Sequence, residues 1–239
     1  MEFVSADLGN SRLKLLIDDD LLAFNLDNDF YDELIELIGD KEFAYSSVNR
    51  IAEEKLLEKL TANSVRIRKL TLDDIENLIS LDGIEGMGLD RALGLAGALS
   101  LIIAPVITID CGSALTVNIL GKNSQFLGGI IMPGLITQAE SLRRINPILY
   151  PTNFVKPTDK IPKNTNDNVM AGMINSLQGG VTKYLTEVFE ELEWTKGNIP
   201  IFVTGGYREL IADELIAKGF NVQIHENLVT LGIKSIVNV

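Results

Sequence analysis

Two short segments of the chain carry nearly the same pattern of residues. Asp7–Ser11 and Asp110–Ala114 both read Asp-x-Gly followed by small or polar residues. Each lies between two apolar runs, which predicts a strand, a tight turn and a returning strand. Glycine lets backbone N–H groups approach phosphate oxygens, and a carboxylate can hold a hydrated metal ion. The two turns therefore indicate phosphoryl chemistry, which depends mostly on positioning and charge neutralisation.

The alternative is that each segment is an ordinary turn, because Asp and Gly are common turn residues. A single copy would carry little weight. The second copy stands at the matching place in the other half of the chain. This repetition favours a duplicated domain whose two turns face one cleft.

A third carboxylate lies between the two turns, in the segment Gly88-Leu89-Asp90-Arg91. Asp90 stands where a helix rich in small residues should begin, and a carboxylate there serves as an N-terminal cap. The functional alternative is a general base beside Arg91, whose forked guanidinium suits a substrate carboxylate. Spacing alone favours the cap.

The remaining motifs narrow the chemistry. Gly205 and Gly206 follow a buried-type strand, where they either let a base or ribose approach or form a plain turn. The chain has no Walker-type loop and no G-x-G-x-x-G segment. One histidine, His225, and one cysteine, Cys111, exclude a zinc site and a nucleophilic triad. We expect Cys111 to be a packing residue and His225 to be incidental.

The composition is that of a soluble protein, with 46% hydrophobic and 23% charged residues in 239. The net charge of -12 disfavours nucleic acid and anionic membranes as partners. The single cysteine suits a reducing compartment. No signal peptide and no apolar run long enough to span a membrane are visible. We therefore expect a cytoplasmic protein.

The elements that must position these residues recur in both halves. The predicted strands are Phe3-Val4 with the residues up to Asp7, Leu13–Ile17, Leu21–Leu26, Glu42–Val48, Val65–Leu70, Val106–Asp110, Ala114–Leu120, Ser124–Leu127, Ile199–Thr204 and Val222–Ile224. The predicted helices are Phe30–Ile38, Ile51–Leu60, Thr71–Leu81, Asp90–Ala104, a helix that follows the loop Met132-Pro133-Gly134 and runs through Arg144, Asn166–Trp194, Tyr207–Lys218 and Leu228–Val237.

The ends of some elements carry further expectations. Asp29 is placed to cap the first helix and Gly39 to end it. Gly128-Gly129 is expected to be a turn, and the stretch 146–162 an irregular segment. Three strands followed by alternating helices and strands in each half predict an α/β protein with mixed sheets. Residues 1–104 and 105–239 would form its two subdomains, which flank a central cleft.

Taken in chain order, the motifs resemble the type III pantothenate kinase family. Those that carry the resemblance are Asp7-x-Gly9-Asn10-Ser11, Ser46-Ser47-Val48, Gly88-x-Asp90-Arg91, Asp110-x-Gly112-Ser113-Ala114-x-Thr116, Gly128-Gly129-Ile130-x-x-Pro133-Gly134-Leu135, Asn164-Thr165 and Thr204-Gly205-Gly206. The resemblance implies the duplicated actin-like ATPase fold of acetate kinase, sugar kinases and Hsp70. It also implies phosphorylation of pantothenate to 4'-phosphopantothenate by ATP with Mg²⁺, the first step of coenzyme A biosynthesis.

The resemblance also implies a role for each matching residue. Asp90 is similar to the family's general base, and Asp110 to its ligand for a monovalent cation, K⁺ or NH₄⁺. Asp7 would organise Mg²⁺, through water, together with the phosphates. The implied substrate-binding residues are Asn10, Gly88, Arg91 and Thr165. The implied nucleotide- and phosphate-binding residues are Asp7, Gly9, Ser11, Gly112, Ser113, Thr116, Gly205 and Gly206. Thr165 resembles a threonine that reaches the neighbouring subunit's substrate, which implies a homodimer.

The chain departs from the family pattern in a few places. Ser11 and Ser113 replace threonine and keep the hydroxyl. Leu81 stands where the family commonly has a tyrosine, nine residues before Asp90. This departure motivates one alternative, a kinase of the same fold that phosphorylates another small hydroxy acid. The other alternative is a non-catalytic regulatory relative.

Overall fold

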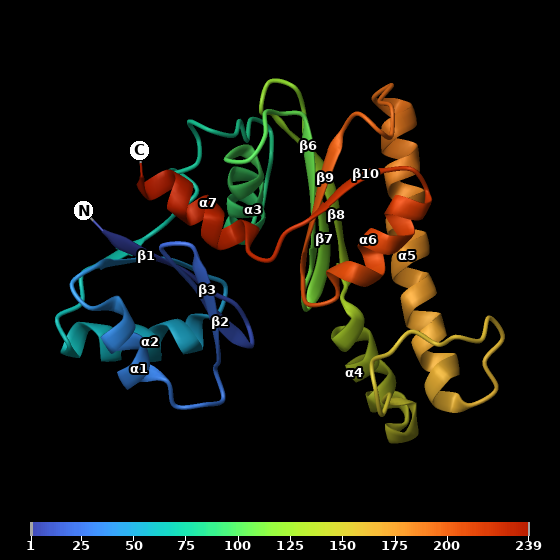
Figure 1. Cartoon of the computed structure of the whole chain (residues 1–239), viewed down its shortest axis with the longest axis horizontal. Helices are drawn as coiled ribbons and strands as arrows, with labels where there is room; N and C mark the ends of the chain where they lie inside the picture. Colours follow the sequence, from blue (N-terminus) through green and yellow to red (C-terminus); the bar gives the residue numbers. More distant parts are fainter. Residues whose placement is uncertain (1, 239) are drawn as a thin grey trace. The chain divides into compact units, whose positions relative to one another are not determined.

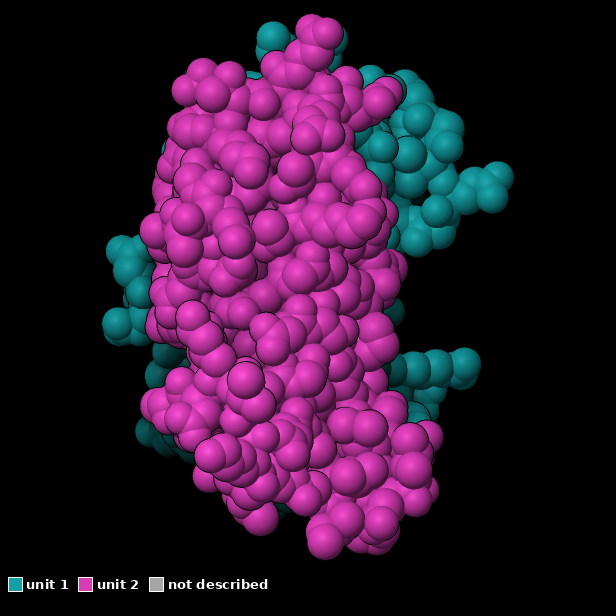
Figure 2. Space-filling model, turned by 90° about the vertical axis from the view of Figure 1, so that its right-hand side faces the viewer, with its two compact units in different colours: residues 1–106, 120–128, 227–239 teal, residues 107–119, 129–226 magenta. Residues whose placement is uncertain are grey.

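The computed structural model describes residues 2–238 and divides the chain into two compact units. The first unit contains residues 1–106, 120–128 and 227–239, and the second contains residues 107–119 and 129–226 (Figure 2). The C-terminal helix therefore packs with the N-terminal elements. The division into subdomains 1–104 and 105–239 stays a prediction.

The first unit is built on a five-stranded sheet in the order β3-β2-β1-β4-β5. The strands are β1 (Phe3–Leu8), β2 (Arg12–Ile17), β3 (Asp20–Asn25), β4 (Glu42–Ser47) and β5 (Ile67–Lys69). β1 pairs with β2 in the antiparallel sense and with β4 in the parallel sense. The predicted hairpin around Asp7–Ser11 is confirmed, and the sheet is mixed as expected.

Helices cover both faces of this sheet. The helices α1 (Tyr31–Ile38) and α2 (Arg50–Ala62) share one apolar core with alternate residues of β1 and β4, such as Val4 and Phe43. The helices α3 (Leu89–Leu99) and α7 (Leu228–Val237) contact the other face and lie side by side in Figure 1. Because side chains alternate along a strand, Asp7 lies on the α3–α7 face, opposite Leu8.

The α3–α7 contact depends on two glycines. A Cβ atom on Gly97 would lie 2.0 Å from the carbonyl oxygen of Leu228. A Cβ atom on Gly232 would lie 2.1 Å from the carbonyl oxygen of Leu93. The two helix backbones are therefore in direct contact, which only glycine permits at these positions.

Three predictions for the first unit are wrong: one helix cap, one helix and the end of another helix. Asp29 does not cap α1, because the N-cap is Phe30, whose buried ring stacks on Phe24 at 5.1 Å between centroids. Residues 71–81 form turns rather than a helix, and the backbone of Ser80 pairs instead with the carbonyl of Ser124 and the N–H of Phe126. The helix α3 ends at Leu99, five residues before the predicted end.

The second sheet has the order β10-β9-β6-β7-β8, and most of its residues belong to the second unit. The strands are β6 (Val106–Cys111), β7 (Ala114–Leu120), β8 (Phe126–Pro133), β9 (Pro200–Gly205) and β10 (Asn221–Ile224). The helices are α4 (Leu135–Ile145), α5 (Thr165–Glu191) and α6 (Arg208–Ala217), with a short 3₁₀ turn at Pro147–Leu149. Apolar residues of β6, β7 and β9 share one core with these three helices.

The strand β8 differs from its prediction. It runs through Gly128 and Gly129, which were expected to form a turn, and it ends at Pro133. A Cβ atom on Gly129 would lie 1.9 Å from the carbonyl oxygen of Val117 in β7. The glycine is therefore required by the close approach of a neighbouring backbone rather than by a turn. The irregular stretch predicted at 146–162 is confirmed, apart from its 3₁₀ turn.

Candidate functional site

The first candidate group lies at the carboxyl end of β1 in the first unit. Asp7 is half-buried, and the hydroxyl of the buried Ser46 donates to its Oδ1 over 3.5 Å. These residues are register partners in the parallel β1–β4 pair. The turn that follows is closed by the N–H of Gly9, which donates to the carbonyl of Arg12 over 3.0 Å. Gly9, Asn10 and Ser11 are therefore presented at the tip of a fixed hairpin, with Asn10 and Ser11 exposed.

The second group stands at the start of α3, also in the first unit. Asp90 lies in the first turn of this helix, and the N-cap is Gly88, with no side-chain cap bond. The capping role favoured by spacing alone is therefore wrong. A Cβ atom on Gly88 would lie 2.6 Å from Oδ1 of Asp90 and 3.6 Å from Cδ of Arg91. Both side chains fold back over Gly88, whose lack of a side chain gives them room.

Arg91 is supported by an aromatic ring that sequence analysis missed. Its guanidinium carbon lies 5.5 Å from the centroid of the Phe126 ring, within range of a cation–π contact. Phe126 is only 4% exposed. A short backbone ladder fixes it, because its N–H donates to the carbonyl of Ser80 and the N–H of Ser80 donates to the carbonyl of Ser124. The segment before α3 is thus tied to the ring that supports Arg91.

The second unit brings together another set of predicted residues around Asp110. Gly205 has a φ of +94°, and a Cβ atom on it would lie 2.6 Å from Oδ1 of Asp110 and from the backbone of Cys111. The N–H of Gly206 donates to the carbonyl of Cys111 over 3.1 Å. The Asp110 turn and the β9–α6 turn are therefore in direct contact, and glycine is required where they meet.

The same hairpin tip also contacts the start of α4. The carbonyl oxygen of Ser113 accepts bonds from the N–H of Gly134 at 2.9 Å and from the hydroxyl of Thr137 at 2.6 Å. Gly112 and Ser113 thus lie in one place with Asp110 and Gly205. Thr116 lies further along β7, is 8% exposed, and its hydroxyl accepts from the amide of Asn118.

Thr165 is not part of the Asp110 group. It begins α5 and lines an open pocket between α4 and α5, together with Gln138, Leu142 and Val169. The small apolar pocket beside Cys111 and Gly112 shares none of its lining residues. The role implied for Thr165 requires a partner chain.

Burial shifts the pKa of both the lone cysteine and the lone histidine from the ordinary value. Burial, reinforced by the nearby carboxylates of Asp110 and Glu209, raises the pKa of the Cys111 thiol well above its ordinary value. The expectation that Cys111 is a packing residue is confirmed by its 4% exposure. Burial lowers the pKa of His225, although Glu226 opposes the shift. His225 is therefore neutral at pH 7.

The oxygen-bearing side chains near Asp7 indicate which metal ion could bind there. Within residues 2–238 no three His, Cys, Asp or Glu side chains gather into a cluster that could hold a metal ion. Asp7 offers one carboxylate beside the Ser46 hydroxyl. This set fits Mg²⁺, which keeps several waters and is held by one or two carboxylates plus substrate phosphates.

A family model for type III pantothenate kinase matches residues 4–187, which is most of the chain. The chain belongs to the type III pantothenate kinase family. A relative of that name from Sulfurihydrogenibium sp. is 30% identical over 202 residues, covering 83% of this chain and 78% of the relative. Further relatives of the same name match over shorter segments, which span 49% to 58% of their lengths.

Solved structures confirm the fold predicted for this type III pantothenate kinase family member. A Baf family transcriptional activator from Campylobacter jejuni, as its structure is described, has a TM-score of 0.66 at 23% identity and covers 99% of this chain and 98% of its own. The activator of a 2-hydroxyisocaproyl-CoA dehydratase from Clostridium difficile, solved with ADPNP, has a TM-score of 0.56 at 12% identity, covering 100% and 95%. These likenesses show the duplicated actin-like fold alone. Among the described residues, no helix is both long and apolar enough to cross a membrane.

Three residues of this type III pantothenate kinase family member lie against the predicted groups but were missed in the sequence. They are Phe126 below Arg91, Arg208, whose guanidinium donates to the carbonyl of Gly205 over 3.1 Å, and Asn49, whose amide donates to the carbonyl of Asn10 over 3.3 Å. Only Asn49 carried a local signal, because Asn precedes a helix and is a preferred N-cap residue. The Arg91–Phe126 contact joins segments far apart in the sequence, whereas Arg208 lies only three positions after Gly205.

Proposed function

We propose that this chain transfers the γ-phosphoryl group of ATP to the terminal hydroxyl of pantothenate, forming 4'-phosphopantothenate for coenzyme A biosynthesis. The observation that carries the proposal is the match of residues 4–187 to the type III pantothenate kinase family. The chain keeps the Asp90-Arg91 pair within that match, with both side chains folded over Gly88.

Asp90 is proposed as the general base that takes the proton of the attacking hydroxyl. Its place in the first turn of α3 puts its carboxylate at the positive end of the helix dipole. A carboxylate at this end of a helix interacts favourably with the dipole. Arg91 and Asn10 are proposed to bind the substrate, with the Arg91 guanidinium directed to its carboxylate. Gly88 would let the substrate approach, and Thr165 would contribute from a partner chain.

The phosphates of ATP are proposed to lie against the glycines and hydroxyls of the two hairpin turns. The proposed phosphate-binding residues are Gly9, Ser11, Gly112, Ser113 and Thr116, with Gly205 and Gly206 at the nucleoside. Asp7 would hold Mg²⁺ through water, and the ion would neutralise charge on the transferring phosphoryl group. The rigid contact of Gly205 with Asp110 and Cys111 supports a preorganised turn.

Asp110 is proposed to bind a monovalent cation, K⁺ or NH₄⁺, together with nearby backbone carbonyls. At equal ionic strength we expect phosphorylation to be rapid in KCl or NH₄Cl and at least about tenfold slower in NaCl, since each 1.4 kcal/mol of lost charge stabilisation is tenfold in rate. Asp110→Asn should remove the difference between the salts. Equal wild-type rates in all three salts would contradict this role for Asp110.

A homodimer is proposed because apolar side chains of the second unit are exposed to water. Four side chains in and near the 146–162 segment are strongly exposed: Ile145 at 76%, Ile148 at 69%, Val155 at 65% and Ile161 at 81%. Burying them against a second copy would remove them from water. We expect sedimentation velocity to give twice the 26.2 kDa chain mass. Ile145→Glu with Ile148→Glu should give monomers, whereas a wild-type monomer at micromolar concentration would contradict the dimer.

The substrate is tested by measuring ADP release from MgATP with a panel of small hydroxy acids. Pantothenate should give the highest kcat/KM. The second candidate is another hydroxy acid, favoured by Leu81, which stands where the family commonly has a tyrosine. Turnover of a different acid without turnover of pantothenate would establish the second candidate and overturn the first.

A further inference from the structure

We propose that Asn49 is a positioning residue for the substrate-binding turn Gly9–Ser11, which it holds through the carbonyl of Asn10. The inference rests on the proposed function, in which Asn10 contacts the substrate. Asn49 follows β4, and its side-chain amide donates to the Asn10 carbonyl oxygen over 3.3 Å. The two residues are 39 positions apart in the sequence, so the bond joins two separate turns.

Strand pairing brings the two turns together. β1 and β4 are parallel, and their last register pair is Leu8 with Ser47. The N–H of Val48 then donates to the carbonyl of Leu8 over 3.2 Å. Beyond this point both strands leave the sheet: β1 leads into the exposed turn and β4 leads into α2. The Asn49 amide continues the connection where the backbone ladder stops.

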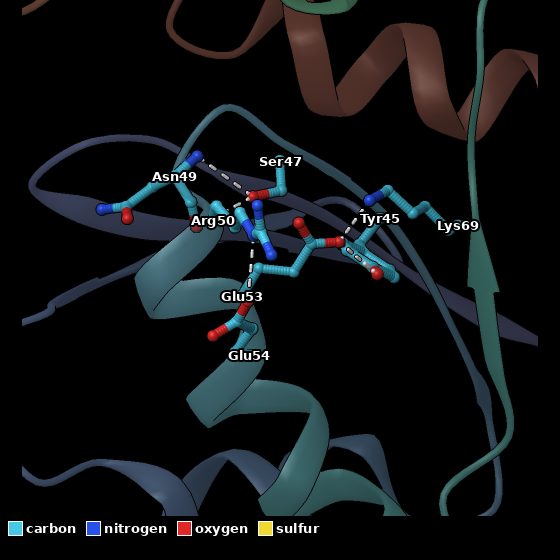
Figure 3. Close-up of polar contacts among 7 residues, drawn as sticks. All are labelled: Tyr45, Ser47, Asn49, Arg50, Glu53, Glu54 and Lys69. Carbon is cyan, nitrogen blue, oxygen red and sulfur yellow. Dashed lines mark hydrogen bonds and ion pairs between the residues drawn. The ribbon is translucent and has the colours of Figure 1, made fainter.

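Asn49 is itself held in a defined place. Its Oδ1 accepts from the N–H of Ala52 over 3.1 Å, which makes it the N-cap of α2. Its own N–H donates to the hydroxyl of Ser47 over 3.2 Å (Figure 3). One oxygen thus caps the helix while the amide nitrogen of the same side chain reaches the turn.

A charged cluster holds the other side of this arrangement. In Figure 3, Glu53 of α2 lies between the hydroxyl of Tyr45, at 2.7 Å, and the ammonium group of Lys69, at 2.5 Å. Burial alone would raise the pKa of Glu53, but bonds from Lys69, Tyr45 and Ser47 outweigh it and lower the pKa. The ionised Glu53 therefore fixes the first turns of α2 to β4 and β5. Asn49, as the N-cap of α2, is held in place with them.

Backbone bonds hold the two ends of this turn, since the N–H of Gly9 donates to Arg12 and the N–H of Leu26 donates to the carbonyl of Ser11 over 3.1 Å, and Asn49 adds a bond at the exposed Asn10 between them. Asn10 and Ser11 have no buried side chain to anchor them. Substrate-positioning residues must stay close to their productive geometry, and a displacement of about 1 Å can lower a rate about 10²-fold. A tether on the backbone of Asn10 limits this displacement without contacting the substrate.

Asn49→Asp separates the tether from the cap. The carboxylate keeps an oxygen for the N–H of Ala52 and remains a good N-cap, but it has no donor for the Asn10 carbonyl. We expect the KM for pantothenate to rise about three- to tenfold, the effect of one lost hydrogen bond. The KM for ATP and the thermal midpoint should stay unchanged. Asn49→Ala, which loses both bonds, should raise the same KM and also lower the midpoint.

The matched control is Asn63→Asp at the other end of α2. Asn63 donates a similar amide-to-carbonyl bond, to Lys59 over 3.0 Å, with no contact to the turn. The Asn63→Asp variant should leave the KM for pantothenate and the KM for ATP unchanged. A KM for pantothenate in Asn49→Asp within twofold of the wild type, or an equal rise in both KM values, would overturn the inference.

Hydrogen exchange of a peptide that covers residues 8–13 tests the tether without any substrate. Exchange should be faster in Asn49→Asp than in the wild type and in Asn63→Asp, because the turn is released. Unchanged exchange would overturn the tether even if pantothenate is a substrate. If the wild type phosphorylates no hydroxy acid, the proposed function fails, and the exchange result still decides whether Asn49 holds the turn.

Discussion

Replacing Asp90 by Asn is expected to abolish most of the phosphorylation while leaving the fold intact. Removing a general base lowers the rate by about 10²–10⁴-fold. Asn matches Asp in size, and Asp90 makes no side-chain cap bond whose loss would destabilise α3. The thermal midpoint and the affinity for ATP should therefore change little. Steady-state kcat with saturating pantothenate and MgATP measures the effect.

The matched control for this variant is Asp32→Asn. Asp32 also lies in the first turn of a helix, α1, so both variants lose a similar interaction with a helix dipole. The control should retain wild-type kcat. A kcat for Asp90→Asn within a few-fold of the wild type would eliminate Asp90 as the base, and an equal loss in both variants would assign the effect to helix stability.

Replacing Gly97 by Ala is expected to have the largest effect on stability. Its Cβ atom would lie 2.0 Å from the carbonyl oxygen of Leu228, so α3 and α7 must move apart. Overpacking of this kind destabilises by about 1–3 kcal/mol and occasionally more. Because the obstacle is backbone rather than a flexible side chain, we expect about 3 kcal/mol, which lowers the melting temperature by roughly 6–12 °C in a chain of this size.

Gly94→Ala is the control, since it lies in the same helix and a Cβ atom there meets nothing within 4 Å. Alanine has a higher helix propensity than glycine by about 1 kcal/mol, so Gly94→Ala should stabilise the protein. Thermal and urea unfolding of both variants give opposite signs if the α3–α7 contact is as close as described. Stabilisation by Gly97→Ala would contradict that contact.

Most helices and strands could be predicted because the residue patterns that indicate them lie within the elements themselves. The apolar run Leu13–Ile17 next to an Asp-x-Gly turn predicted the first hairpin, and Gly39 ends α1 as expected. Errors arose where a distant contact decided the outcome. Gly128-Gly129 was predicted to be a turn, but the glycines are there because β7 approaches β8, and that approach leaves no mark in the nearby sequence.

The residues of the candidate site also fall into those that the sequence could predict and those that it could not. Asp7, Asp90 and Asp110 could be found because their types and spacing point to phosphate chemistry and because the motifs occur in family order. Phe126 could not, because it acts through a contact with a segment that only folding brings near. Arg208 lies three positions after Gly205, but nothing in the sequence shows that its guanidinium turns back to the Gly205 carbonyl. Gly88 was assigned to the substrate, and the structure adds that it makes room for Asp90 and Arg91.

The most direct test of the account is to identify the product of the wild-type reaction. The purified chain is incubated with pantothenate, MgATP and KCl, and the mixture is followed by ³¹P NMR and mass spectrometry. The account predicts a new phosphate monoester with the mass of 4'-phosphopantothenate, formed in equal amount with ADP. ADP formation without this monoester, or no reaction under conditions where the chain is folded, would contradict it.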